Sequence, residues 1–341
     1  MVVFTRRKKL IEKDNTGLFF KSDTVNKMLS VCIVNYNTKY LLGQCLSSVL
    51  EHSEGLDVEI VVVDNHSWDE SVNMIKRDFP EVKLIANKRN TGYAHAVNQA
   101  IKLARGDFIL ILNSDTLVLP ATLFQTLRFM NHQKDAGIVG CRVLNPDKTL
   151  QKSCRSFPSI LNYIHENFYF DRLFSQSRWF GRPFMSYFKY DEIREVDVVL
   201  GAFMMMRREL VDQIGGMDEQ FFMYSEETDY CYRAKQNGWK VYFYPDAEII
   251  HFGGQSTQNA SVRMFIELHK SHLRYASKYH GRGYVFVVKI ILMCGIVVRV
   301  FISCVVRILD FLGKRNSDKS KQQLTRYWRA LKWHFGIPLK A

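Results

Sequence analysis

The chain has 341 residues, of which 47% are hydrophobic and 24% charged, a composition typical of a globular protein with a sizeable core. Its net charge of +13 belongs to the tail: residues 262–341 carry 16 Lys and Arg against 3 Asp and Glu, and the remainder is balanced. Because the basic tail is also apolar, it favours an anionic membrane surface as partner and argues against nucleic acid.

Seven cysteines are scattered along the chain without a C-x-x-C pair. Their odd number argues against a disulfide framework and for a reducing compartment. The basic residues near the N-terminus are not followed by an apolar segment, so we expect no signal peptide. Residues 1–28 are polar and aperiodic, and we expect them to form an N-terminal extension.

From residue 29 onward, short apolar runs alternate with amphipathic segments. This alternation predicts an α/β domain with a mostly parallel sheet and helices on both faces. Expected strands lie at 29–37, 58–65, 82–87, 107–115 and 137–144, and expected helices at 39–52, 67–77, around 98–104 and at 120–132.

Polar side chains stand at the ends of three expected strands, where ligands bind in such sheets. They are Asn35 and Asn37, Asp64 and Asn65, and the run from Asn113 to Asp115. This coincidence predicts a nucleotide site, although Asp64 could instead cap a helix and Asp115 could close a turn. Neither a G-x-G-x-x-G nor a G-x-x-x-x-G-K-[ST] motif is present, which disfavours a dinucleotide dehydrogenase and a P-loop NTPase.

The second half is less regular. Residues 142–190 predict an irregular, partly helical segment on the acceptor side, and residues 196–207 a strand followed by a short helix. Ser225 is expected to cap a helix whose first turn holds Glu226, Glu227 and Asp229, and which ends near residue 238. A further strand leads to His251 before two glycines, where a metal-binding role is plausible although a lone histidine is more often structural.

These motifs resemble those of the family 2 inverting glycosyltransferases with the GT-A fold, and most closely the rhamnosyltransferase branch that acts on lipid-linked acceptors. The resemblance extends over about residues 29–255. Its pieces are VCIVNYNT at 31–38, VVVDNHSWDES at 61–71, NTGYAHAVNQAI at 90–101, LNSDTLV at 112–118, and the segment from GAFMMMRREL to HFGG at 201–254.

The resemblance implies a nucleotide-sugar donor and a divalent cation, Mg²⁺ or Mn²⁺. It implies that Asp115 and His251 bind the cation, and that Glu227 is the catalytic base with Glu226 as the alternative. Relatives usually carry Asp at the position of Glu227, and many carry Asp at that of Asn113. The implied donor-binding residues are Val34, Asn35, Tyr36, Asn37, Asp64, Asn90, Gly92, Asn98, Asn113 and Ser114, and the implied acceptor-side residues are Arg155, Gly201, Ala202 and Asp229.

The tail predicts two amphipathic helices, at 282–310 and 322–335. On a helical wheel, Arg282, Lys289, Arg299 and Arg307 share one narrow face with Ser303 and Asp310. A helix of this kind is expected to lie in the membrane interface, because a span would bury Arg299. The alternative is a core helix packed on the catalytic domain or on a second subunit.

We therefore expect three regions: an extension at 1–28, a catalytic domain at 29–265, and a membrane-attachment region at 266–341. The expected activity is transfer of L-rhamnose from dTDP-L-rhamnose to a polyprenyl-diphosphate-linked saccharide at the cytoplasmic face of the membrane, by a peripheral or monotopic protein that could form a homo-oligomer. Alternatives are a galactofuranose, N-acetylglucosamine or other hexose donor, a non-catalytic scaffold of the same fold, and a nucleic-acid binder.

Overall fold

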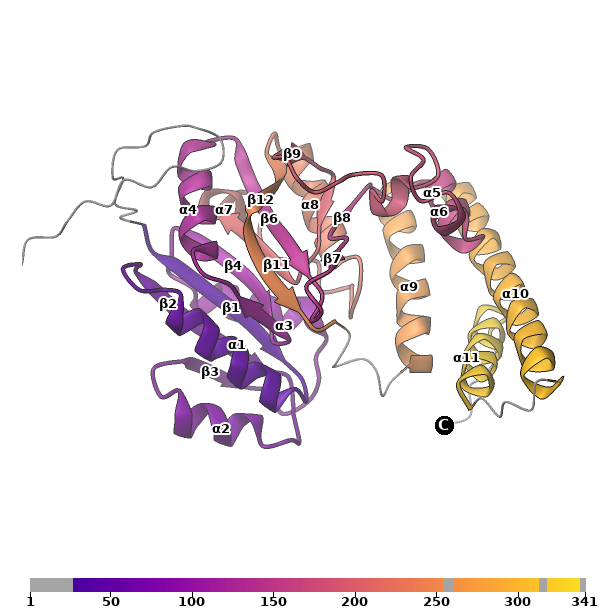
Figure 1. Cartoon of the computed structure of the whole chain (residues 1–341), viewed down its shortest axis with the longest axis horizontal. Coiled ribbons are helices and arrows are strands. Elements are labelled where there is room, and N and C mark those ends of the chain that lie inside the picture. Colours follow the sequence, from indigo (N-terminus) through magenta and orange to yellow (C-terminus); the bar gives the residue numbers. More distant parts are fainter. Residues whose placement is uncertain (1–26, 254–260, 313–317, 338–341) are drawn as a thin grey trace, which may run out of the picture.

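The computed structural model describes residues 27–253, 261–312 and 318–337. The expected N-terminal extension therefore lies almost wholly outside the described residues. In Figure 1 the sheet and its covering helices form the left of the molecule, and helices of the tail form the right.

Four parallel strands form the first half of the main sheet, in the order β3-β2-β1-β4. Their register pairs Asn35 with Asp64 and Val34 with Asn113, so the polar strand ends meet at one edge. The strands are β1 (Leu29–Asn35), β2 (Val58–Asp64), β3 (Lys83–Ala86) and β4 (Phe108–Asn113), and the connecting helices are α1 (Lys39–Glu51), α2 (Ser71–Asp78) and α3 (Tyr93–Leu103).

The sheet continues as β4-β11-β6-β12-β5, with β11 antiparallel to both neighbours and β12 parallel to β6. The strand expected at 196–207 is wrong as a single element. It divides at Gly201 into β10, which pairs with β8 in a small separate sheet, and β11 in the main sheet. The bounds are β5 (Thr116–Val118), β6 (Ala136–Leu144), β10 (Val198–Val199), β11 (Phe203–Arg207) and β12 (Lys240–His251).

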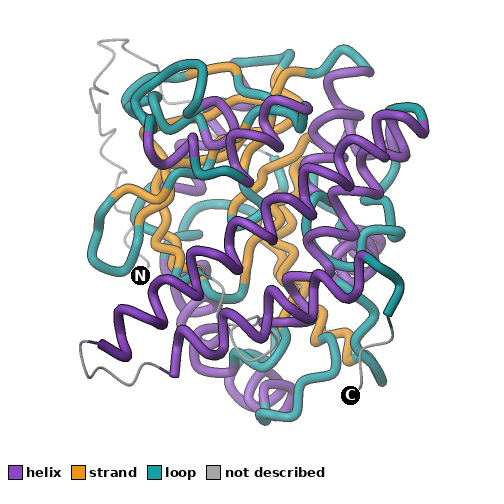
Figure 2. The backbone as a smooth tube through the Cα atoms, turned by 90° about the vertical axis from the view of Figure 1, so that its right-hand side faces the viewer, coloured by secondary structure: helices purple, strands orange, loops and turns teal. Residues whose placement is uncertain are grey.

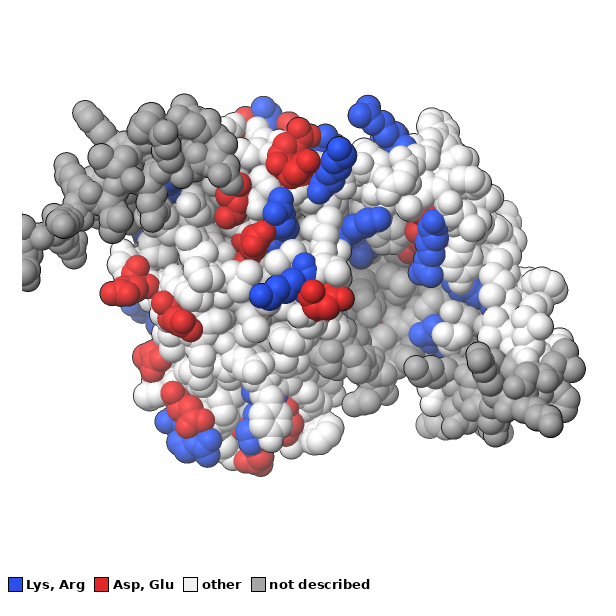
Figure 3. Space-filling view, viewed as in Figure 1, with Lys and Arg blue, Asp and Glu red and all other residues white. Residues whose placement is uncertain are grey.

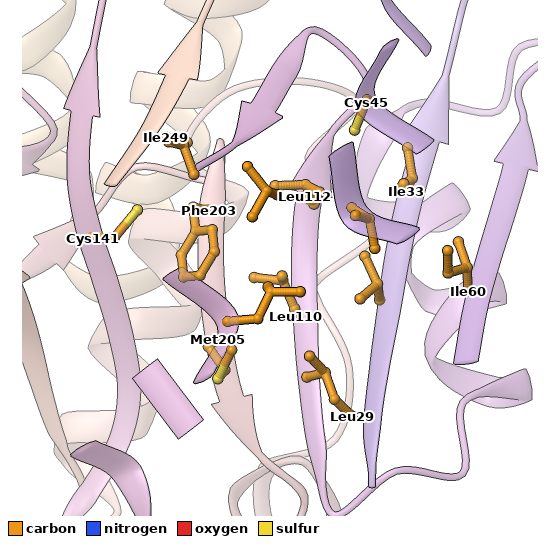
Figure 4. Close-up of a cluster of buried hydrophobic side chains, with 14 of the residues drawn as sticks. Leu29, Ile33, Cys45, Ile60, Leu110, Leu112, Cys141, Phe203, Met205 and Ile249 are labelled. Atoms are coloured by element: carbon orange, nitrogen blue, oxygen red, sulfur yellow. The ribbon is translucent and has the colours of Figure 1, made fainter. Parts of the chain in front are cut away.

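Alternate strand residues face two apolar layers, as the strand period of two requires. Leu110 and Leu112 pack into the layer covered by α1 and α4, whereas Ile109 and Ile111 pack into the layer covered by α3, α7 and α8. Figure 4 shows part of the first layer, with Phe203 and Met205 of β11 beside the β4 leucines. The additional helices are α4 (Thr122–His132), α7 (Arg208–Ile214) and α8 (Glu226–Gln236).

Residues 145–197 form short elements, consistent with the irregular and partly helical segment expected there. Short strands pair at the margins of the sheets, and two helices project toward the tail (Figure 1). The elements are β7 (Leu150–Gln151), β8 (Cys154–Arg155), α5 (Ile160–Asn167), α6 (Phe170–Leu173), a 3-10 turn (Arg182–Phe184) and β9 (Arg194–Glu195).

The tail contains three described helices, α9 (Ser261–Tyr279), α10 (Arg282–Leu312) and α11 (Asp318–His334). Both expected amphipathic helices are present, but α9 was not expected. The domain boundary expected after residue 265 falls inside α9. Figure 2 shows α10 and α11 crossing the side of the molecule that Figure 1 has on its right.

The middle of the polar stripe of α10 faces other helices of the protein, whereas Arg282 and Arg307 are exposed. Arg299 donates to backbone and side-chain oxygens of Asn167 at the end of α5, and Ser303 is buried. The opposite face is apolar and exposed, with Phe301 69% exposed. The segment Arg282–Leu309 is also long and apolar enough to cross a membrane by length and composition.

Candidate active site

A buried polar cluster joins the ends of β1 and β2. Asn35 donates from Nδ2 to Asp64 Oδ2 at 2.8 Å and to Ser67 Oγ at 3.1 Å, and the backbone N–H of Ser67 donates to Asp64 Oδ1 at 2.9 Å. Asn37, at a positive φ of 53°, donates its backbone N–H to Ser67 Oγ. Asp64 therefore both orders the loop that follows it and stands where the resemblance places the donor base.

A second cluster is centred on Asn65, whose side chain is nearly fully buried. Its Nδ2 donates to Asn90 Oδ1 at 3.0 Å and to the Gly92 carbonyl at 3.2 Å, and its Oδ1 accepts from Thr91. Gly92 has φ 89° and ψ 165°, and a Cβ there would lie 2.8 Å from Phe222. The loop carrying Asn90 and Gly92 thus touches the segment that leads into α8.

Asp115 and His251 come together although 136 positions separate them. The main-chain N–H of Phe252 donates to the Asp115 carbonyl at 2.9 Å, and Asp115 Oδ1 lies 3.3 Å from His251 Nε2. The other ring nitrogen, Nδ1, lies 2.6 Å from Gln151 Oε1, and Gln151 Nε2 donates to Asn145 Oδ1 at 3.0 Å. Since an amide oxygen only accepts, His251 Nδ1 donates this bond, and in the neutral imidazole the lone pair is then on Nε2.

This arrangement fits a divalent cation. A carboxylate oxygen of Asp115 and, in the neutral imidazole, the Nε2 lone pair of His251 face the same space. Their separation is close to that of neighbouring ligands around one ion at ~2.1 Å. Within the described parts of the chain no group of three or more His, Cys, Asp or Glu side chains could hold a metal, so these two are the protein ligands that the geometry supports.

Glu226 and Glu227 begin α8. One oxygen of each, Oε2, is buried without a hydrogen-bond partner among the described residues. Burial, reinforced by the charge of Glu227, raises the pKa of Glu226 well above its ordinary value, so the protonated form of Glu226 is favoured. Ser225 precedes the helix as expected, but at φ 64° its side chain makes no capping bond, which corrects the expected cap.

Gly201 and Tyr93 lie between the Glu226–Glu227 pair and the Asp115–His251 pair. A Cβ built on Gly201 would lie 3.9 Å from Glu227 Cβ and 3.8 Å from Tyr93 Oη. Tyr93 donates to Asn113 Oδ1 at 3.1 Å, and Asn113 Nδ2 lies 3.4 Å from His251 Nε2. The Glu226–Glu227 pair and the Asp115–His251 pair are thus bridged by only a few side chains along one edge of the sheet.

Three expected site residues have other tasks in the structure. Asn98 bonds the backbone N–H and carbonyl of Met217 and also Glu219. Asp229 is fully buried and accepts from Arg233, Lys278 and Tyr279, which ties α8 to α9. Arg155 lies over the ring of Phe184 at 5.1 Å. Asn98 and Asp229 thus make bonds that pack the protein together, and their expected roles toward a ligand stay predictions.

The other expected residues lie along the same edge. Ser114 Oγ is 2.8 Å from Thr38 Oγ1, and the Ala202 carbonyl accepts the N–H of Asn113. Val34 and Tyr36 are half-buried at the end of β1. Sequence reasoning missed Ser67, Tyr93 and Gln151. Tyr93 directly follows Gly92 in a motif already singled out, but Gln151 sits in a two-residue strand with no sequence signal.

Residues 30–215 match the model of the family described as glycosyl transferase family 2. Among curated proteins, the chain is 26% identical over 270 residues to the N-acetylglucosaminyl-diphospho-decaprenol L-rhamnosyltransferase of Mycobacterium tuberculosis, covering 74% of this chain and 85% of that protein. It is 25% identical over 228 residues to the low-salt glycan biosynthesis hexosyltransferase Agl10 of Haloferax volcanii, covering 62% and 63%.

Among solved structures, the mannosyltransferase PcManGT from Pyrobaculum calidifontis, in complex with GDP-Man and Mn²⁺, superposes with a TM-score of 0.53. The identity is 16%, and the match covers 89% of this chain and 85% of that one. This likeness confirms the expected fold class, a mostly parallel GT-A-like sheet with helices on both faces.

Proposed function

This chain belongs to glycosyl transferase family 2 and is a glycosyltransferase, and from that premise we propose that it moves L-rhamnose from dTDP-L-rhamnose to a polyprenyl-diphosphate-linked saccharide. The support for this donor and acceptor is the similarity to the mycobacterial rhamnosyltransferase over most of both chains. A galactofuranose, N-acetylglucosamine or other hexose donor remains the second candidate, favoured by the similarity to the archaeal hexosyltransferase.

The observation that carries the mechanism is the pair of carboxylates at the start of α8, each with one buried oxygen that has no hydrogen-bond partner among the described residues. Glu227 is the more exposed of the two and accepts the proton of the acceptor hydroxyl as that oxygen attacks the sugar. Glu226, held protonated by burial and by its neighbour, keeps a second negative charge away from the base. Gly201 has no side chain and so leaves room for the acceptor beside Glu227. A Cβ at position 201 would already contact the Glu227 side chain.

On the donor side, Asp115 and His251 would hold Mg²⁺ or Mn²⁺, and such an ion would supply positive charge for the leaving diphosphate. Asp64 and the loop around Asn37 hold the base, and the Asn65–Asn90 cluster positions the backbone around the ribose and diphosphate. Attachment of α10 to an anionic membrane at the cytoplasmic face would bring this edge to a lipid-linked acceptor. Homo-oligomerisation is compatible with this arrangement.

The decisive experiment compares the full chain with Glu227→Gln and Glu226→Gln, given a panel of nucleotide sugars and a polyprenyl-linked acceptor. Glu227→Gln is expected to lower kcat by about 10²–10⁴-fold with donor binding unchanged. Glu54→Gln, at an exposed position after α1, is the matched control and keeps full activity.

Addition of EDTA abolishes transfer if Asp115 and His251 act as proposed, and Mn²⁺ or Mg²⁺ restores it. Transfer from a different donor would discard the rhamnose assignment and retain the mechanism. Full activity in Glu227→Gln with loss in Glu226→Gln would exchange the two roles. Silence with every donor would favour a non-catalytic scaffold.

A further inference from the structure

A compact aromatic segment projects from the catalytic domain beside α10. It comprises residues 168–182, between α5 and the 3-10 turn, and we refer to it as the aromatic knob. Its rings contact one another: Phe174 and Phe180 have centroids 5.1 Å apart, and Phe170 and Phe180 5.8 Å apart. Nevertheless, Leu173 is 70%, Phe174 52% and Trp179 58% exposed.

The exposed side chains of the knob are held in place by the fold. Ser186 donates from Oγ to the Ser175 carbonyl at 2.6 Å, and its backbone N–H donates to the Gly181 carbonyl. A Cβ on Gly181 would lie 2.5 Å from that Ser175 carbonyl, so the two ends of the loop pack closely enough to exclude a side chain at position 181. The apolar surface is therefore a fixed feature, not the by-product of a loose loop.

The charges of the knob have one sign at its surface. Arg172, Arg178 and Arg182 are exposed, whereas its single acid, Asp171, is 7% exposed. Exposed aromatic and leucine side chains beside exposed arginines are the composition of segments that bind an anionic lipid interface. Aromatic and arginine side chains are also common at protein interfaces. The choice of a lipid surface therefore rests on the exposed apolar face of α10 beside the knob.

The knob and α10 are locked together. Gly295 of α10 packs so closely against Asn167 that a side chain would clash, since a Cβ there would lie 2.7 Å from Asn167 Cβ. Arg299 bonds Asn167 and lies over the ring of Tyr169 at 5.1 Å. A buried cluster including Tyr163, Val288 and Leu292 completes the contact between α5 and α10.

The outer face of α10 adds a larger exposed apolar surface to that of the knob. Figure 3 shows mainly uncharged surface, with scattered Lys and Arg, over the part of the molecule that contains α5, α6 and α10. A soluble monomer rarely exposes so many large apolar groups in one region. On α10 they are Phe286, Val287, Ile290, Val297, Phe301, Ile302, Val305, Val306, Ile308 and Leu309.

We propose that the aromatic knob is a second membrane contact, which inserts Leu173, Phe174 and Trp179 into the interface of an anionic bilayer. This inference extends the proposed membrane attachment through α10. It assigns to the catalytic domain itself a lipid-binding element that fixes how the domain is oriented on the surface. Two rigidly joined contacts restrict tilting and rotation, whereas a helix alone permits both.

The test uses the full chain and vesicles of phosphatidylcholine with and without phosphatidylglycerol. The variant Leu173→Ser/Phe174→Ser/Trp179→Ser is compared with Tyr40→Ser/Leu103→Ser/Phe124→Ser, which removes three exposed apolar side chains from α1, α3 and α4. The knob variant is expected to bind anionic vesicles at least about tenfold more weakly, since burying one large apolar side chain already exceeds that factor. The control variant binds as the unmodified protein does.

Quenching by brominated lipid gives an independent measurement. The unmodified protein is expected to lose more fluorescence than Trp179→Phe, because Trp179 lies within reach of the lipid bromines. Vesicle binding without this difference, and with an unaffected knob variant, would overturn the inference and leave attachment through α10 intact. Failure of the unmodified protein to bind any vesicle would overturn both proposals. Dissociation of an oligomer by the knob substitutions, with unchanged vesicle binding, would assign the surface to a second copy of the chain.

Discussion

Gln151 accepts a hydrogen bond from His251 Nδ1 at 2.6 Å and so decides which nitrogen of that ring is free to bind a cation. The Gln151 amide is itself oriented by Asn145, one step further from the site. The residue lies in β7, whose pairing with β6 places it against the end of β12. A glutamine without any functional signal in the sequence thereby orients the histidine that the sequence singled out.

Gln151→Ala is expected to weaken Mn²⁺ affinity by about 10–100-fold, as loss of such supporting bonds does elsewhere. The free ring can then rotate and exchange its tautomer. Titration of the purified chain with Mn²⁺, followed by electron paramagnetic resonance without donor sugar, measures the effect directly. Gln151→Glu keeps an acceptor and should retain most of the affinity, and Lys152→Ala should bind normally. Equal affinity in Gln151→Ala would show that the ring needs no support.

Glu226 should make stability depend on pH in the opposite sense to most acids. Its pKa is raised in the folded protein, so folding takes up a proton between the ordinary carboxyl value and the raised one. Stability from this group is complete at acid pH and falls as pH rises through that window. Glu226→Gln should therefore gain stability relative to the unmodified protein by up to about 1.4 kcal/mol per pH unit across it.

Thermal unfolding of both proteins from pH 4 to pH 8 measures this difference. The two curves should converge at the acid end, where the carboxyl is protonated in both folded and unfolded chains. Glu54→Gln, at an exposed position after α1, should show no such divergence. A constant offset between Glu226→Gln and the unmodified protein would mean that packing, not ionisation, separates them.

Lys278 joins α9 to α8. Its Nζ donates to the fully buried Asp229 at 2.5 Å and to Asp218 at 2.7 Å. Lys278→Met removes both bonds and leaves Asp229 with Arg233 and Tyr279, so we expect a loss of about 1.5–3 kcal/mol of unfolding free energy. Lys270→Met, on the same helix, removes a lysine whose side chain is 47% exposed and should cost less than about 1 kcal/mol. Urea unfolding in detergent compares the two variants. Equal losses of unfolding free energy would show that the buried bonds of Lys278 contribute no more than the bond of Lys270.

Gly92→Ala tests the contact between the loop that carries Asn90 and Gly92 and the segment that leads into α8. The backbone there has φ 89° and ψ 165°, a region open essentially to glycine alone, which costs other residues about 1–3 kcal/mol. The added methyl would also meet the Phe222 backbone at 2.8 Å. Gly55, at φ 79° with open space around it, is the matched control for strain without a clash. Thermal unfolding should place Gly92→Ala clearly below Gly55→Ala.

Much of the fold could be predicted from the sequence because apolar runs and polar strand ends report directly on a parallel sheet. Asn35, Asp64 and Asp115 were found in this way, since parallel strands bring their ends to one edge. The break at Gly201 was missed because residues 196–207 are apolar on both sides of it, as both the small sheet and the main sheet require. Hydropathy does not distinguish one buried strand from two.

The contacts of Asp229 and Asn98 could not be predicted for a different reason. Each depends on partners brought by the fold: Lys278 is 49 positions from Asp229, and Met217 is 119 from Asn98. A motif shows that such a residue is constrained, but a buried structural bond constrains it as strongly as a ligand does. α9 was missed because its apolar stripe is interrupted by polar residues such as His269 and Ser271, which are buried by neighbouring helices.

The bond between α8 and α9 also determines where the chain can be shortened. A version ending before residue 261 would strip Asp229 of two donors and leave that carboxylate paired with Arg233 alone. A version ending just after residue 280 would keep the bonds and remove α10 and α11, but it would uncover the apolar surface around Tyr163. A water-soluble form for crystallisation therefore needs the later end point together with polar replacements on α5.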